Sequence, residues 1–114
     1  MTAGWVKVFR KMTDWEHYKD GPTFRVMMHL ILTARPTATT YKGIRIPAGS
    51  VLTSYPKLAA ETGLTIKQVR SAIGALKRSG EVAVKRAGSG TSKGTLYKLN
   101  SWPSYQAKGQ KNGQ

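Results

Sequence analysis

Polar and cationic side chains recur along one side of the segment Leu64–Val82, which reads LTIKQVRSAIGALKRSGEV. The residues able to donate hydrogen bonds from this side are Thr65, Lys67, Gln68, Arg70, Ser71 and Arg78. In the major groove of DNA, Gln can pair with adenine through two hydrogen bonds, and Lys or Arg can pair with guanine. The residue types are therefore suited to reading base edges.

A helix would bring these side chains onto one face. At about 100° per residue, the apolar residues form one stripe, which comprises Val69, Ile73 and Leu76 with Ile66 and Ala72 on its flanks. Lys67, Ser71 and Arg78 fall on the opposite side beside Gly74 and Ala75, whose small side chains would permit close approach to a groove floor. The segment thus predicts an amphipathic helix that is buried on one face.

The start of this helix is marked by Thr65, with Gln68 three residues later as a capping-box partner, and Gly80 follows its end at Ser79. The other predicted elements are short helices between residues 5 and 15, a helix over 22–34, a loop over 35–43, strands at 44–46 and 51–53, a helix over 55–62 and a hairpin with arms near 82–84 and 96–99. This order is that of an α+β winged helix-turn-helix fold. We expect a three-helix core, a β-hairpin wing, a short additional strand and extra N-terminal short helices.

One domain is expected from 114 residues, spanning 1–105, with 106–114 as a disordered tail or the start of a linker. The chain carries 19 Lys and Arg against 5 Asp and Glu, a net charge of +14. Such a charge favours a polyanionic partner, with nucleic acid ahead of an anionic membrane surface. RNA is disfavoured because its deep, narrow major groove excludes a helix.

Membrane association and secretion have little support in the sequence. No apolar run approaches the roughly 18 residues that a spanning helix needs. The first residues also lack the apolar core of a secretory signal, and the chain has no cysteine. We expect a cytoplasmic protein, associated with the nucleoid of a bacterial cell, that does not bind membranes.

A solvated helix surface is the plain alternative explanation for the cationic face. Two observations favour DNA instead. Acidic residues are absent from this face, whereas solvated faces usually mix both signs of charge. The helix is also followed by a basic hairpin, whose Lys85, Arg86 and Lys93 would flank the duplex as a wing. Phosphate contacts would then supply most of the affinity and the helix would supply sequence choice.

Catalytic chemistry has few candidates. Asp14, Glu16 and Asp20 with His17 could suggest a metal site, but helix-surface acids are the simpler explanation. The segment GSGTSKG lacks the spacing of a phosphate-binding loop and has no helix after it. We therefore expect no enzyme activity, no cofactor and no bound metal.

Several motifs occur together: opening Gly-Trp and Asp-Trp pairs, a G-x-I strand, G-S-V-x-T-S leading into K-L-A, and G-L-T-x-x-Q-V-R-x-A-I-x-x-L-K-x-x-G-E-V. Over residues 4 to about 105 the chain resembles the N-terminal winged-helix domain of phage replisome organisers and DnaD-like replication initiation proteins. The resemblance implies recognition of repeated sites at a replication origin, by several copies side by side. It also implies helicase-loading partners bound through a region absent here, and phosphate contacts from Ser54, Tyr55 and Lys57.

Two other functions stay open on the sequence. A transcriptional regulator or recombination-directionality factor of a mobile element would use the same DNA-reading helix. A winged helix that binds partner proteins is the third candidate, because the Trp-rich N-terminus could form such a surface.

Overall fold

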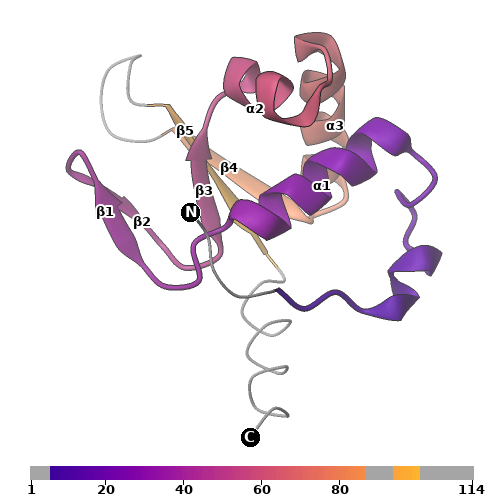
Figure 1. The fold of residues 1–114 in the computed structure, drawn as a ribbon, viewed down its shortest axis with the longest axis horizontal. Coiled ribbons are helices and arrows are strands. Elements are labelled where there is room, and N and C mark those ends of the chain that lie inside the picture. Colours follow the sequence, from indigo (N-terminus) through magenta and orange to yellow (C-terminus); the bar gives the residue numbers. More distant parts are fainter. Residues whose placement is uncertain (1–5, 87–93, 101–114) are drawn as a thin grey trace, which may run out of the picture.

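The computed structural model of the protein describes residues 6–86 and 94–100. Within them, three α-helices and two small antiparallel sheets form a compact α+β domain (Figure 1). In chain order the elements are the 3₁₀ helix η1 (Arg10–Asp14), α1 (Gly21–Thr33), β1 (Thr39–Tyr41), β2 (Ile44–Ile46), β3 (Ser50–Thr53), α2 (Tyr55–Thr62), α3 (Ile66–Arg78), β4 (Val82–Arg86) and β5 (Thr95–Leu99). No helix in these residues is long and apolar enough to cross a membrane.

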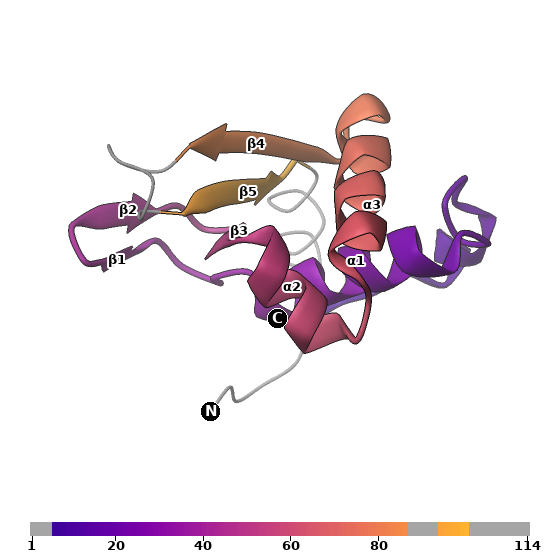
Figure 2. The same ribbon diagram turned by 90° about the horizontal axis from the view of Figure 1, so that it is seen from above.

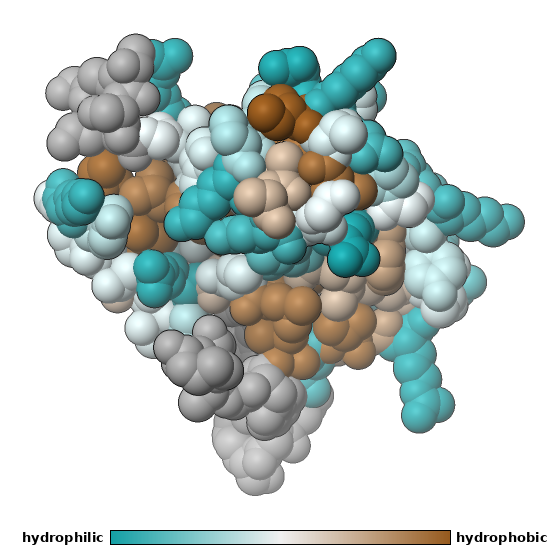
Figure 3. All heavy atoms as spheres, turned by 45° about the horizontal axis from the view of Figure 1, so that its top comes forward, coloured by the Kyte–Doolittle hydropathy of each residue, from teal (hydrophilic) through white to brown (hydrophobic). Residues whose placement is uncertain are grey.

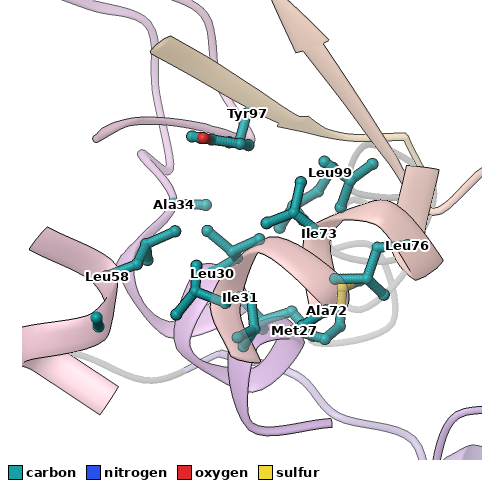
Figure 4. Packing of buried hydrophobic residues seen from close by; sticks show 14 residues of the cluster. Met27, Leu30, Ile31, Ala34, Leu58, Ala72, Ile73, Leu76, Tyr97 and Leu99 are labelled. Carbon is teal, nitrogen blue, oxygen red and sulfur yellow. The ribbon is translucent and has the colours of Figure 1, made fainter. Parts of the chain in front are cut away.

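The core lies between α1, α3 and one face of the larger sheet. Leu30 of α1 and Ile73 and Leu76 of α3 are fully buried, and Figure 4 shows them beneath Tyr97 and Leu99 of β5. The N-terminus of α1 is capped by Asp20, whose carboxylate accepts hydrogen bonds from the backbone N–H and the hydroxyl of Thr23. The predicted helix over 22–34 is confirmed.

The larger sheet has the strand order β3–β5–β4, all antiparallel (Figure 2). Residues directly opposite each other share a face of such a sheet, and successive residues along a strand alternate between faces. Tyr97 lies opposite both Val51 and Val84, so these three side chains share the face that the helices cover. The predicted arms of the C-terminal hairpin are confirmed as β4 and β5.

A second, two-stranded sheet precedes the larger one. Thr39–Tyr41 pairs with Ile44–Ile46, joined by the two-residue turn Lys42-Gly43, in which both residues have positive φ, 49° and 79°. The expectation that residues 35–43 form a loop is therefore wrong for β1. Two-residue hairpin turns of this kind favour Asn-Gly or Asp-Gly, and Lys in the first position hides the signal.

The N-terminal segment packs across the end of α3. The indole Nε1 of Trp15 donates a hydrogen bond to Glu81 Oε2 at 3.0 Å, and His17 Nε2 lies 3.1 Å from Ser79 Oγ. Among the described residues of this segment, one short helix, η1, is present, where one or two were expected. The predicted tail, residues 106–114, lies outside the described residues.

Candidate nucleic-acid interface

The start of α3 is fixed by its connection to α2. Gly63 ends α2 in the left-handed conformation, φ 79°, and Leu64 leads to the N-cap Thr65. Arg25 Nε of α1 donates a 2.6 Å hydrogen bond to the carbonyl oxygen of Thr62, the last residue of α2. Three helices thus converge on this turn, and it sets the direction in which α3 leaves the core.

The outer face of α3 carries the predicted set of side chains. Exposed residues on this helix include Lys67, Gln68, Arg70, Ser71 and Arg78. The buried residues are Val69, Ala72, Ile73 and Leu76, as the helical periodicity predicts. Ile66 is the exception: it was expected on the flank of the buried stripe, but it is the first residue of α3 and 42% of it is exposed. Figure 3 brings α2 and α3 forward and shows hydrophilic side chains projecting around isolated hydrophobic ones.

The side chain of Gln68 is already engaged. Its Oε1 accepts a hydrogen bond from Thr65 N at 2.9 Å, while its own backbone N–H donates to Thr65 Oγ1 at 3.0 Å. This capping box is the one that the sequence predicts. Bidentate pairing with adenine needs the same oxygen as an acceptor, so Gln68 acts on α3 first as a capping residue.

Arg70 and Tyr55 join α3 to the start of α2. The Arg70 guanidinium lies over the Tyr55 ring, with its Cζ 5.7 Å from the ring centre. Ser54, the N-cap of α2, accepts a hydrogen bond from Lys57 N, and the Lys57 side chain is exposed. The residues expected to contact DNA from the start of α2 and from α3 thus lie on one continuous surface. Fifteen residues separate Arg70 from Tyr55, so no local sequence pattern indicates their contact.

Tyr97 lies beneath this surface and stays neutral. Burial, reinforced by the nearby Tyr55 and partly offset by a hydrogen bond with Thr95, raises the pKa of Tyr97 to about 12. Its phenol is therefore neutral near pH 7 and adds no negative charge beneath the cations.

Lys85 and Arg86, the two residues expected in the wing that the structure describes, lie on opposite faces of the larger sheet. Arg86 lies opposite Thr95, which lies opposite Thr53, the residue before Ser54. By strand alternation Arg86 shares the helix-covered face with Tyr97, next to the start of α2, whereas Lys85 lies on the other face. The structure therefore brings Arg86 toward the α2–α3 surface and separates Lys85 from it. Lys93 lies outside the described residues.

All five acidic residues lie outside the outer face of α3 and the start of α2. Their places are Asp14 in η1, Glu16 beside His17, Asp20 at the cap of α1, Glu61 near the end of α2 beside His29, and Glu81 bonded to Trp15. Within the described residues, no Lys or Arg of α2, α3 or β4 is paired with a carboxylate. No group of three potential metal ligands occurs in this part of the chain either. The positive charges on the outer face of α3 and at the start of α2 are therefore not neutralised by carboxylates of the described residues.

Comparison of the chain with protein-family models, with curated proteins and with solved structures found no match. The resemblance to replisome organisers accordingly rests on the sequence motifs alone.

Proposed function

We propose that this protein is a winged helix-turn-helix protein that binds double-stranded DNA, with α3 in the major groove and the β4–β5 hairpin as the wing. The observation that carries the proposal is the unneutralised cationic surface formed by α3, the start of α2 and the Arg86 end of β4. A stable domain keeps such a surface when a polyanion is its partner. An α-helix fits the major groove of B-DNA, and its N-terminal residues reach base edges there.

The side chains divide between two roles. Lys57, Arg70 and Arg86 lie around the start of α2, where they would hold phosphates, and Tyr55 keeps the Arg70 guanidinium in place. Lys67 and Ser71 lie on the outer face of α3, where they would reach base edges. Phosphate contacts supply affinity that falls with salt, and base contacts supply sequence choice.

Origin recognition is the biological setting that we propose, by the resemblance to replisome organisers and DnaD-like initiators. Several copies would then bind repeated sites, and helicase-loading proteins would be further partners. Transcriptional regulation and control of recombination use the same DNA-reading surface and are the runner-up. The intramolecular hydrogen bond of Trp15 argues against the described part of the N-terminal segment as a protein-binding surface.

A fluorescence titration at two salt concentrations tests this function. One duplex has a random sequence, and the others tile the coding region of the protein and its flanks. Tighter binding to one tile that persists at the higher salt supports sequence-specific recognition, and binding near its own coding region supports an origin. Equal, steeply salt-dependent binding to all duplexes leaves only electrostatic attachment, and absence of binding at low salt refutes the proposal.

A further inference from the structure

The β1–β2 hairpin is a cationic projection to which the proposed function assigns no role. Tyr41, Lys42 and Arg45 are exposed, with 49% of Tyr41 accessible to solvent. The Lys42 ammonium lies over the Tyr41 ring, 5.4 Å from its centre. No acidic residue occurs between Asp20 and Glu61, so the hairpin and the segments that lead into and out of it carry only positive charges.

The base of the hairpin is held by backbone hydrogen bonds. Arg35 N donates to Ser50 O at 3.1 Å, and Gly49 N donates to Arg35 O at 2.7 Å, so the segments entering and leaving the hairpin are joined. Leu99 N of β5 donates to Gly49 O at 2.9 Å, and Ile46 on the inner side of β2 is almost fully buried. An isolated two-stranded hairpin is marginally stable, but this one is anchored to the larger sheet.

The turn keeps an unfavourable residue at its tip. Lys42 is the one non-glycine residue with positive φ in the described part of the chain, and its value is 49°. Asn, Asp or Gly fits this position better than Lys. Backbone preference therefore does not account for Lys42. A positive charge at the tip of a projecting hairpin can instead bind a phosphate group of a polyanion.

The hairpin projects on the same side of the molecule as the wing. Figures 1 and 2 both show β1 and β2 extending from the body toward the side on which β4 ends and β5 begins. Strand β3, which follows the hairpin, leads directly to Ser54 at the start of α2. The base of the hairpin joins the larger sheet at Gly49, beside Leu99, and its strands extend from there toward the side on which β4 ends at Arg86 (Figures 1 and 2).

We propose that the β1–β2 hairpin is a second DNA-binding arm, in which Lys42 and Arg45 contact phosphates beside the stretch of duplex that α3 occupies. This inference rests on the proposed DNA-binding function and extends the footprint beyond that of a single wing. The contacts are to the sugar–phosphate backbone, so the arm adds affinity and salt dependence without adding base preference.

The test compares Lys42→Asn with Lys11→Asn, a matched charge change on η1, which Figure 1 shows on the other side of α1 from α2. Affinity for duplex DNA is measured over a salt series. Loss of one phosphate contact lowers the salt slope by about 0.9, which weakens binding about eightfold at 0.1 M salt and about fourfold at 0.2 M. Lys42→Asn with Arg45→Gln should lower the slope by about 1.8. Lys11→Asn should leave it unchanged.

Thermal unfolding distinguishes the arm from a turn with a purely structural role. Asn tolerates positive φ better than Lys, so Lys42→Asn should keep or raise the melting temperature while it weakens DNA binding. A lower melting temperature with unchanged affinity would make Lys42 a turn residue and overturn the proposal. Equal effects of Lys42→Asn and Lys11→Asn would also overturn it, because only net charge would then matter.

Two further outcomes separate this inference from the proposed function. If the wild-type protein binds no duplex at low salt, both fail together. If it binds DNA and Lys42→Asn binds equally well but loses attachment to phosphatidylserine vesicles, the DNA-binding function stands and the arm belongs to a membrane surface instead.

Discussion

Replacing Gln68 by Glu should stabilise the fold and weaken DNA binding at the same time. The carboxylate of Glu can accept the hydrogen bond from Thr65 N that Gln68 Oε1 accepts now at 2.9 Å. It also places a negative charge in the first turn of α3, which favours the helix by about 0.3–1 kcal/mol. For a domain of this size that is a rise in melting temperature of about 1–8 °C.

The same carboxylate faces the proposed DNA. Adding one negative charge there is comparable to losing one neutralised phosphate, so Gln68→Glu should bind all duplexes about eightfold more weakly at 0.1 M salt. Gln68→Ala is the control, because it removes the cap without adding charge. It should cost about 0.5–1.5 kcal/mol of stability, or roughly 2–12 °C, and leave binding to random duplex unchanged.

Calorimetry and fluorescence anisotropy together decide the outcome. A stabilised Gln68→Glu protein that binds DNA as tightly as wild type refutes the placement of the first turn of α3 on DNA. A destabilised Gln68→Glu protein refutes the capping arrangement. If Gln68→Ala loses binding to its preferred duplex by about 1–3 kcal/mol but keeps its affinity for random duplex, the side chain leaves its cap to read a base.

Three further predictions concern the same surface. Gly74→Ala should raise stability by about 0.5–1 kcal/mol in calorimetry, because Ala favours a helix interior over Gly. The added Cβ would lie 3.3 Å from an Arg78 guanidinium nitrogen, so it should displace Arg78, keep α3 farther from the groove floor and lower DNA affinity. Arg86→Ala should reduce affinity several-fold more than Lys85→Ala in the same titration, because only Arg86 shares the helix-covered sheet face; equal losses would contradict this geometry. Folding raises the pKa of Tyr97 from 10.0 to about 12, so the stability that its neutral phenol contributes is complete below pH 10 and is lost as the pH rises through 12. This loss amounts to at most about 2–3 kcal/mol. Alkaline unfolding curves of Tyr97→Phe should lack it.

The helices were predictable because their ends carry local signals. Thr65 and Gln68 form the capping box, Gly63 ends α2 with positive φ, and the apolar spacing of α3 gave its buried face. These features depend on residues three or four apart, which sequence periodicity captures. On α3 the periodicity misplaced Ile66, because helical spacing gives the direction of a side chain but not how far the neighbouring elements extend along the helix.

Features that depend on tertiary contacts or unusual turns were missed. The β1–β2 hairpin escaped because Lys42 stands where Asn or Gly usually marks the turn. The stacking of Arg70 on Tyr55 joins two helices and leaves no local pattern. Charge composition indicated a polyanionic partner, but strand register was needed to show that Lys85 and Arg86 face opposite ways.

The most direct test of the central claim is cleavage of DNA by an iron chelate attached to α3. The chain has no cysteine, so Ser71→Cys gives a single attachment point on the exposed face, and Lys11→Cys on η1 is the matched control. With the tightest-binding duplex, hydroxyl radicals should cut the DNA from position 71 many times more than from position 11. Equal cutting from both positions, or cutting from position 11 alone, would contradict the placement of α3 in the major groove.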